Sequence, residues 1–404
     1  MPDHFVPSPH PLRNPEFRLL WIGSSISGLG DQFYLVALPW LIVQLTGSSV
    51  VLGTVTMTAA IPRAALMLLG GAVSDRASPR RIMIATASAR TVLVAAIAAL
   101  IWTHVLQLWQ LYLLAFTFGV ADAFAGPAAQ TYLPSLVRPE QLPAANSVFQ
   151  STAQISTLMA PAPAGLLIKT FGTAWAFLID AVSFLFVIGA LCRLPDPKRT
   201  STGTPRANML RSILDGLEYV KRDVALSSFM QLIAVLNFAI AGPASVGLAF
   251  IAKQRFGTPA AFGALMSAVG AGSLTGVLLA GVAKHRKRGR VLLLAGIIIG
   301  LCLAGISRLS QLPALVTVLF LMSATAAFLN VQLIAWFQQR VDRAMLGRVM
   351  SVLMFAAVGL IPFSLAAAGL AIKWSLPGMF LTAGAMVVSV SLLAAAHRPV
   401  REID

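Results

Sequence analysis

Leu292-Leu-Leu-Ala-Gly-Ile-Ile-Ile-Gly-Leu301 is a run of ten residues without a polar side chain, in a chain of 404 residues. The strands of a membrane β-barrel alternate apolar and polar residues, and this run does not alternate. An α-helix in lipid satisfies its backbone amides within its own segment, so it tolerates an unbroken apolar run. The stretch therefore predicts a membrane-spanning helix.

The composition of the whole chain indicates the same class of protein. Hydrophobic residues make up 57% and charged residues 11%, whereas a soluble globular protein carries about 25% charged residues. This excludes an ordinary soluble enzyme and a secreted disulfide-rich domain. The net charge of +16 comes from basic residues spaced between apolar runs, which indicates membrane topology and no nucleic-acid partner. Cys192 and Cys302 show no metal-ligand spacing, and we expect no metal site and no cofactor.

The apolar runs predict an all-α membrane protein with twelve transmembrane helices, since each span needs about 20 residues. The predicted spans are 18–45, 49–73, 82–102, 108–130, 146–168, 174–193, 226–251, 260–283, 291–307, 312–336, 347–371 and 377–396. Prolines 161, 163, 243 and 362 fall inside spans, and we expect them to bend the fifth, seventh and eleventh helices.

The basic residues predict the orientation of these spans. With the N-terminus in the cytoplasm, 23 of the 30 lysine and arginine residues lie in cytoplasmic segments and five on the opposite side. Arg63 and Arg90 fall within spans. Because cytoplasmic loops are enriched in basic residues, we expect a multi-pass protein of a bacterial plasma or inner membrane, with both termini cytoplasmic.

The longest polar stretch, 194–223, divides the chain into two sets of six spans. We therefore expect an N-terminal bundle at 1–193, a cytoplasmic linker at 194–223 and a C-terminal bundle at 224–404. Apolar residues recur at helical spacing from Leu210 to Val220, which predicts a short amphipathic helix in the second part of the linker.

The two halves also resemble each other. Gly71, Arg76 and Arg80 recur as Gly281, Arg286 and Arg290, and Val137, Leu142, Ser147 and Val148 recur as Val341, Leu346, Ser351 and Val352. Both sets fall at equivalent positions of the two halves, which favours two pseudo-symmetric six-helix bundles. Such bundles rock around a site near the middle of the membrane and give alternating access.

The segment Gly71-Ala-Val-Ser-Asp75-Arg76-Ala-Ser-Pro-Arg80-Arg81 lies between the second and third spans. It resembles the loop signature of the major facilitator superfamily, with one extra residue before the arginine pair. Other segments are similar to the macrolide-efflux and enterobactin-exporter branch of that family: Asn14-Pro15-Glu16-Phe17-Arg18-Leu19-Leu20-Trp21, Gly30-Asp31, Leu133-Pro134-Ser135-Leu136-Val137 and Gly216-Leu217-Glu218-Tyr219-Val220. The resemblance implies a twelve-helix transporter, and members of this branch are mostly exporters.

The loop resemblance also implies a gate that holds the cytoplasmic side closed in one state. In this interpretation Asp75 pairs with Arg348 or binds a helix N-terminus, and Arg80 or Arg81 reaches Glu140. The alternative is that these residues are topology charges at a lipid surface. The gate candidates are Gly71, Asp75, Arg76, Arg80, Arg81, Glu140, Arg286, Arg290 and Arg348.

Three acids lie within the spans, and a charge in the middle of a bilayer usually faces a cavity or a partner. Asp31, Asp122 and Asp180 are therefore the candidates for proton coupling. Asp31 and Arg63 lie at similar predicted depth, so Asp31 is either a proton carrier modulated by Arg63 or half of a fixed ion pair. Asp122 is expected to pair with Arg90, and an alternative for Asp180 is that it is simply hydrated at the rim.

Neutral polar residues within the spans predict a substrate cavity. The candidates, together with Arg63, are Asn146, Gln150, Gln154, Gln231, Asn237, Asn330 and Gln332. Asn146, Gln150 and Gln154 recur every four residues and share one helix face. The alternative is that these amides hold helices together, which is their commoner use in a bundle.

These features predict a secondary transporter that exports an amphiphilic small molecule, such as a drug, a siderophore or a related metabolite, in exchange for protons. One alternative is uptake or lipid translocation without proton antiport. A membrane enzyme or ATP-driven pump is disfavoured, because the chain contains neither a Gly-x-x-x-x-Gly-Lys-Ser/Thr run nor a His-Glu-x-x-His motif. We expect membrane lipids, the substrate and protons as partners, and a monomer.

Overall fold

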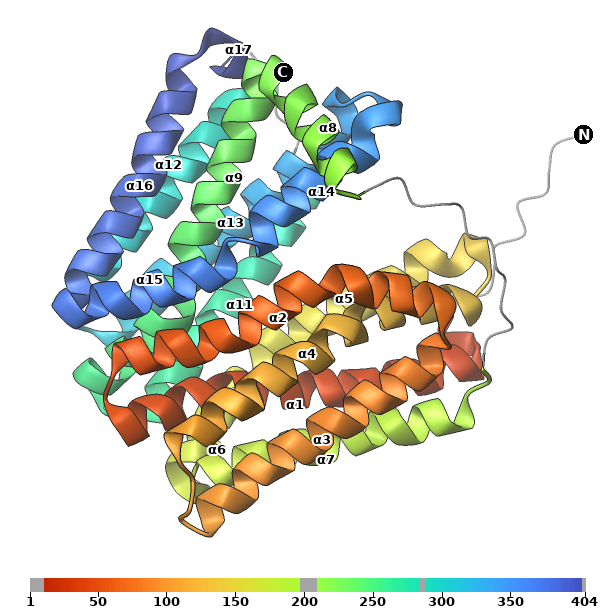
Figure 1. Cartoon of the computed structure of the whole chain (residues 1–404). Helices are drawn as coiled ribbons and strands as arrows, with labels where there is room; N and C mark the ends of the chain where they lie inside the picture. The colour runs from red at the N-terminus through yellow and green to blue at the C-terminus, as the bar shows by residue number, and fades with distance from the viewer. Residues whose placement is uncertain (1–10, 197–208, 284–287, 402–404) are drawn as a thin grey trace, which may run out of the picture. The chain divides into compact units, whose positions relative to one another are not determined.

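The computed structural model describes residues 11–196, 209–283 and 288–401, and every regular element in these ranges is helical (Figure 1). The first half contains η1 (Pro11–Arg13), α1 (Pro15–Thr46), α2 (Ser49–Arg76), α3 (Pro79–Trp102), α4 (Leu108–Tyr132), η2 (Leu133–Ser135), η3 (Pro139–Gln141), α5 (Leu142–Met159), α6 (Pro161–Phe171) and α7 (Thr173–Arg193).

The second half begins with α8 (Met209–Arg222). It continues with α9 (Val224–Gly242), η4 (Pro243–Gly247), α10 (Leu248–Ile251), η5 (Ala252–Phe256), α11 (Pro259–Val282), α12 (Arg288–Ile306), α13 (Leu312–Arg340), α14 (Arg343–Val358), α15 (Ile361–Trp374), α16 (Leu376–Ala396) and α17 (Arg398–Arg401).

Eleven helical segments in the described ranges are long and apolar enough to cross a membrane. Each coincides with one of the predicted spans, and the fold class predicted from the sequence is confirmed. The remaining predicted span, 146–168, is built from two helices, α5 and α6, which meet at Ala160. Pro161 starts α6 because proline lacks the N–H that would continue α5.

Proline also interrupts two other spans as expected. Pro243 begins a π-helical turn after α9, and Pro362 occupies the first turn of α15, where the eleventh span resumes after a break at Gly359 and Leu360. A π-turn and a helix break both free backbone groups, so such positions lie where protein covers them or where a cavity is lined.

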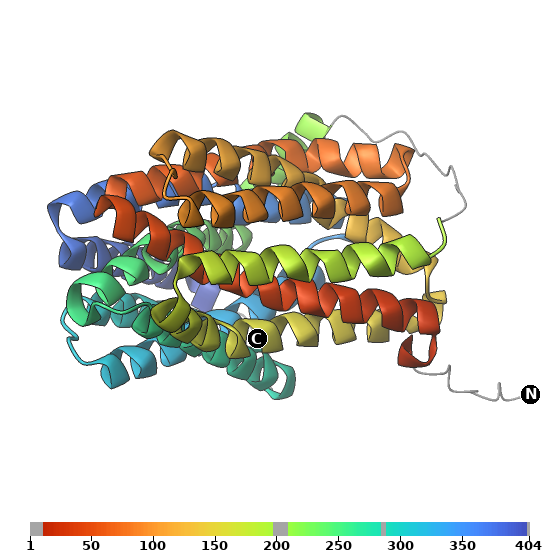
Figure 2. The same cartoon turned by 90° about the horizontal axis from the view of Figure 1, so that it is seen from below.

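The chain folds into two compact units, and unit 1 comprises Met1–Ala37, Thr58–Ser156 and Thr170–Thr202. Within it α3 packs against both α4 and α7. Figure 2 shows α7, in yellow-green, running alongside the red helix α1. Near the start of α1, Phe17 is buried with Leu133, Val137 and Ala145. The Asn14 side-chain amide donates to the carbonyl of Leu136 at 2.6 Å, which ties this end of α1 to the segment between α4 and α5.

Unit 2 comprises Leu38–Met57, Thr157–Lys169 and Gly203–Asp404. Its main helix pairs are α11 with α13 and α12 with α16. The Ser49 hydroxyl donates to the Gly369 carbonyl at 2.8 Å, and the Ala162 amide donates to the Ser267 hydroxyl at 3.0 Å. Short segments from the first, second and fifth spans thus pack with the C-terminal helices. The division of the chain at 194–223 rests on sequence alone and stays a prediction.

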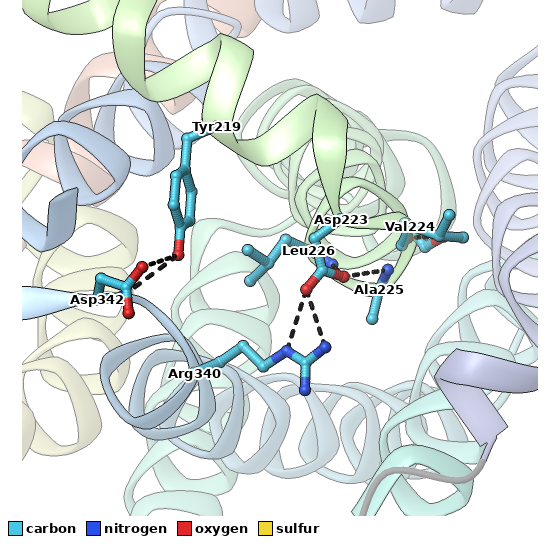
Figure 3. Close-up of polar contacts among 8 residues, drawn as sticks. Tyr219, Asp223, Val224, Ala225, Leu226, Arg340 and Asp342 are labelled. Carbon is cyan, nitrogen blue, oxygen red and sulfur yellow. Dashed lines mark hydrogen bonds and ion pairs between the residues drawn. The ribbon is translucent and has the colours of Figure 1, made fainter.

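Helix α8 is held against the junction of α13 and α14 by three polar contacts. The Tyr219 hydroxyl donates to Asp342 at 3.0 Å, and both Nε and Nη2 of Arg340 donate to one oxygen of Asp223 at 3.1 and 2.9 Å (Figure 3). One turn earlier, Asp215 forms an ion pair with Arg348 at 3.0 Å. Contacts on two turns fix the orientation of α8 as well as its position.

Asp223 has a second role as the N-cap of α9. Its other carboxylate oxygen accepts the amides of Ala225 and Leu226 at 2.8 and 3.2 Å. Burial raises the pKa of Asp223, but the hydrogen bonds from Arg340, Leu226 and Ala225, together with the charge of Arg340, outweigh burial. The pKa therefore lies below its usual value of 3.8.

We expect Asp223→Ala to lower the free energy of unfolding by about 1–2 kcal/mol at pH 7, because it removes a helix cap and an ion pair. A carboxyl group whose pKa falls on folding stabilises the folded state above its unfolded-state pKa, and that contribution is lost as the pH falls through the folded-state pKa. The deficit of the variant should therefore shrink below pH 3.8.

Denaturation in detergent at neutral and acid pH measures this difference. The control is Glu218→Ala, since Glu218 is exposed and pairs only with Arg222 on its own helix. Its effect should stay within about 0.5 kcal/mol. A deficit of Asp223→Ala that persists unchanged in acid would contradict the assignment.

Candidate functional site

Five ionisable side chains from five different helices gather in the membrane-spanning part of unit 1. They are Asp31 on α1, Arg63 on α2, Arg90 on α3, Asp122 on α4 and Asp180 on α7. Three acids and two arginines give this charge cluster a formal charge of −1 when all are ionised. The sequence placed each of them within a span, but it did not show that all five converge.

Asp122 is the centre of the ion pairing in the cluster. One of its carboxylate oxygens binds Arg63 Nε at 2.9 Å, and the other binds Arg90 Nη2. The expected Asp122–Arg90 pair is therefore present. Of the two alternatives for Asp31, the fixed ion pair with Arg63 is wrong, because Arg63 is engaged by Asp122.

The packing of α2 against α4 explains this exchange of partners. A Cβ built on Gly119 would lie 2.1 Å from the carbonyl oxygen of Ala59, so only glycine permits this approach. Gly119 lies one turn before Asp122 and Ala59 one turn before Arg63, so the close contact brings the two charged side chains together. The glycine spacing, Gly119-x-x-Asp122, was the signal available in the sequence.

Arg90 is enclosed by aromatic rings. Its side chain is 11% exposed, and its guanidinium carbon lies 5.0 Å from the centre of the Phe118 ring and 5.7 Å from that of Phe184. Tyr34 stacks on Phe118, with the two ring centres 4.6 Å apart. Aromatic faces attract a desolvated cation, so they hold Arg90 in place beside Asp122.

Asp180 is completely buried, at 0% exposure, and the alternative that it is hydrated at the rim is wrong. Within the described ranges neither of its carboxylate oxygens has a hydrogen-bond partner. The neighbouring Ser183 hydroxyl donates instead to the Asp180 backbone carbonyl at 2.7 Å. The cause of the burial is the close packing of α1 and α7, since a Cβ on Gly30 would lie 2.9 Å from Asp180 Oδ1 and 2.1 Å from Ser183 Oγ.

Asp31 follows Gly30 directly and is half-buried. It lies in the electrostatic field of Arg90, Arg63 and Asp180, but it forms no ion pair with any residue that the structure describes. The cluster thus contains one acid with two cationic partners and two acids with none at bonding distance.

A cavity of about 640 Å³ lies along the polar face of α5. It is lined by Asn146, Ser147, Phe149, Gln150, Ser151 and Ala153. Two of the three α5 amides expected from the sequence are therefore on its wall, and Gln154 is not. Asn146 donates to the Leu142 carbonyl at 3.0 Å within its own helix, so its amide oxygen stays available to a ligand.

The expected cavity residues of unit 2 differ in their hydrogen bonding and exposure. Gln332 on α13 donates to the Ala280 carbonyl on α11 at 3.2 Å, which is the helix-joining use. Asn237 donates to Ile233 within α9 at 2.9 Å. Gln231 and Asn330 are exposed.

Arg80 and Arg81 bind the end of α7, and the expectation that they reach Glu140 is wrong. Arg80 donates to the carbonyls of Leu191 and Cys192 at 2.6 and 2.9 Å, and Arg81 pairs with Asp196 at 3.3 Å. The last carbonyls of a helix lack partners and carry partial negative charge, which attracts the adjacent arginines.

The other gate candidates fall into three groups. Arg348 is engaged by Asp215, a linker acid that the sequence showed only as part of a polar helix face. Gly71 is half-buried, and Glu140 and Arg290 are exposed. The side chains of Asp75 and Arg76, and the whole of Arg286, lie outside the described part of the structure.

The family comparison covers nearly the whole chain. The family described as transmembrane secretion effector matches residues 7–404. The chain belongs to the major facilitator superfamily. It is therefore a multi-pass membrane transporter of small molecules and not an enzyme.

Curated relatives of the chain are efflux proteins. Macrolide efflux protein A of Streptococcus pyogenes is 25% identical over 407 residues, which cover 96% of this chain and 97% of the relative. The multidrug efflux pump Tap of Mycolicibacterium fortuitum is 25% identical and covers 96% of each chain. The enterobactin exporter EntS of Escherichia coli O1:K1 is 26% identical, over 83% of this chain and 80% of its own.

Solved structures show the same fold. The nucleoside transporter NupG superimposes with a TM-score of 0.75 at 13% identity, over 95% of this chain and 98% of its own. A bacterial homologue of the human lysosomal transporter Spinster, in an inward-facing and occupied conformation, gives a TM-score of 0.70 at 13% identity, over 98% of this chain and 99% of its own.

We expect Asp122→Asn to lower the free energy of unfolding by about 3 kcal/mol, because it breaks the ion pairs of two arginines within the membrane. The value is at the lower end for a broken buried pair, since the Arg63 side chain is 61% exposed. Thermal or chemical denaturation in detergent measures it. Asp31→Asn is the matched control, because it removes an acid from the same cluster without breaking an ion pair. Equal destabilisation by the two changes would contradict the central role of Asp122.

Proposed function

We propose that this transporter exports amphiphilic small molecules across a bacterial plasma membrane by alternating access, in exchange for protons. The charge cluster of unit 1 carries this proposal. Carboxyl groups within spans are costly, and in transporters they mark ion pathways and proton relays. The cluster holds one more acid than it has arginines, so a single bound proton brings its formal charge from −1 to zero.

The direction of transport is inferred from the relatives. Macrolide efflux protein A, the Tap pump and the enterobactin exporter all carry out efflux according to their names, and they match the chain along most of its length. The bias of basic residues supports a cytoplasmic position for both termini. Uptake, or lipid translocation without protons, is the competing function.

The cavity along α5 supports an amphiphilic substrate. It combines two amides, Asn146 and Gln150, and two hydroxyls, Ser147 and Ser151, with the aromatic ring of Phe149. A wall of this composition offers hydrogen bonds beside apolar surface, which suits molecules that carry both kinds of group. Gln231 and Asn330 are exposed and remain candidates for substrate contacts within unit 2.

The arginines expected at the cytoplasmic gate connect neighbouring helices. Arg80 and Arg81 attach the start of α3 to the end of α7, and Arg348 attaches α14 to α8. We propose that each set of contacts makes the cytoplasmic ends of its own helices move together, while Gly71 lies in the last turns of α2, before the connection to α3.

The first test uses the purified protein in proteoliposomes with an imposed pH gradient. A macrolide antibiotic and a fluorescent amphiphilic dye serve as substrates, and a pH-sensitive dye reports protons inside the vesicles. We expect each substrate to move against its gradient and to drive a counterflow of protons, which protein-free liposomes do not show. Substrate movement without proton movement would favour the carrier without antiport, and accumulation in the direction of the proton flux would favour uptake.

The second test concerns the α5 cavity. We expect Gln150→Ala to raise the substrate concentration for half-maximal transport about tenfold, because one hydrogen bond between the ligand and this amide is lost. The matched control is Thr117→Ala, since Thr117 is an exposed residue of α4 whose hydroxyl bonds only its own helix. Unchanged transport by Gln150→Ala for every substrate would remove the cavity from the pathway.

A further inference from the structure

We propose that Asp180 and Asp31 together form the site of the coupling proton, and that Asp180 holds this proton in the conformation described. This inference rests on the proposed function and deepens it, because it selects the titrating group among the three intramembrane acids.

Asp122 is not the proton carrier, because both of its oxygens are occupied by cations. Arg63 binds one oxygen and Arg90 the other. Adding a proton to Asp122 would release two arginines inside the membrane without a counter-charge, which is the costliest change available to the cluster. Asp122 therefore stays ionised and holds the arginines in place.

Asp180 has the opposite environment. It is fully buried, and neither of its oxygens has a partner among the described residues. The charged groups that act on Asp180 are Asp31, which disfavours its ionised form, and Arg90, which favours it but is already bound to Asp122. Taking a carboxylate out of water without hydrogen bonds is far more costly than taking a neutral carboxylic acid. The carboxyl group lies against Gly30 on α1, where no side chain intervenes. A proton on Asp180 removes the charge that this dry position cannot support.

Asp31 provides the route by which the proton reaches Asp180. It is half-buried and directly follows Gly30, the residue against which Asp180 packs. Each acid is in the electrostatic field of the other, and two nearby carboxylates disfavour ionisation of both. When the helices separate, water reaches Asp180, the acid ionises, and the proton leaves by way of Asp31.

The proton is favoured over a metal cation by the number of available ligands. Cations such as Ca²⁺ or Mg²⁺ require about six oxygen ligands, and no group of three or more acidic, histidine or cysteine side chains able to hold a metal ion occurs in the part of the chain that the structure describes. Two carboxyl groups, one fully buried and one half-buried, offer too few oxygens for such a cation and suit a proton. Sodium is the alternative that the experiment must separate.

The test is isotope-edited infrared spectroscopy of the purified transporter, which detects the C=O stretch of a protonated aspartic acid. We expect this band in the wild-type protein at neutral pH in both sodium-containing and sodium-free buffer. Asp180→Asn should lose the band, whereas Asp31→Asn should retain it. A band that survives in Asp180→Asn, or that disappears from the wild type when sodium is added, would overturn the proposal.

The same variants are tested for correct folding. Asp180→Asn should melt at or above the wild-type temperature, because a neutral amide replaces an acid without partners, and it should still exchange substrate across the membrane without a gradient. It should lose gradient-driven accumulation. If Asp180→Asn fails to fold, Asp180→Ser serves as the second variant with the same expected loss of the band. Gradient-driven accumulation at the wild-type level in either variant would also overturn the proposal.

The outcomes separate this inference from the proposed function. Proton flux in wild-type proteoliposomes, with no protonated band assigned to Asp180, overturns the inference and leaves the exporter in place. A band assigned to Asp180 without any substrate-driven proton flux overturns proton antiport and leaves Asp180 as a protonated acid. Flux and band together, both lost in Asp180→Asn, support both.

Discussion

An ionised side chain inside a bilayer costs about 3 kcal/mol on insertion scales unless a partner or water compensates it, and unit 1 is arranged around this cost. Five charged residues come from five helices, so no single helix can satisfy them. Asp122 engages both Arg63 and Arg90, which joins α2, α3 and α4 at one point. The pairing leaves Asp31 and Asp180 without bonded cations. Structural stability and sensitivity to protons therefore arise from the same set of side chains.

The close approach of neighbouring helices determines which charged side chains lie near each other. Gly119 lets α4 touch α2 beside Ala59, and Gly30 lets α1 touch α7 beside Asp180. Both glycines lie within one turn of an acid of the cluster, and neither contact tolerates a Cβ. Small residues permit close helix packing in membranes, where apolar side chains gain little by association. Here that packing also sets the distances between charged groups, so a glycine without any chemistry of its own controls the electrostatics of its neighbour.

The sequence predicted the spans well because their cause is local: apolar runs of sufficient length, ended by charges, become helices in lipid. It also predicted an irregularity at Pro161 in the fifth span, although as a bend and not as a division into two helices. The sequence could not predict which way a side chain faces around its helix axis. A pair of Asp31 with Arg63 therefore follows from their similar predicted depth alone. Contacts between distant segments were missed for the same reason. Arg340 and Asp223 are 117 positions apart, and Arg80 binds carbonyls of α7, which no side-chain pattern encodes.

The attachment of α3 to α7 has a practical consequence. Arg80 donates to the carbonyl of Cys192, whose thiol is exposed, while the other cysteine, Cys302, is half-buried. A maleimide-linked spin label or fluorophore would accordingly react first with Cys192, whose carbonyl accepts the hydrogen bond from Arg80. The chain thus contains a natural reporter position in the last turn of α7, next to the arginine pair of the signature segment. Replacing Cys302 alone yields a single-thiol protein in which the surroundings of the label can be compared between states.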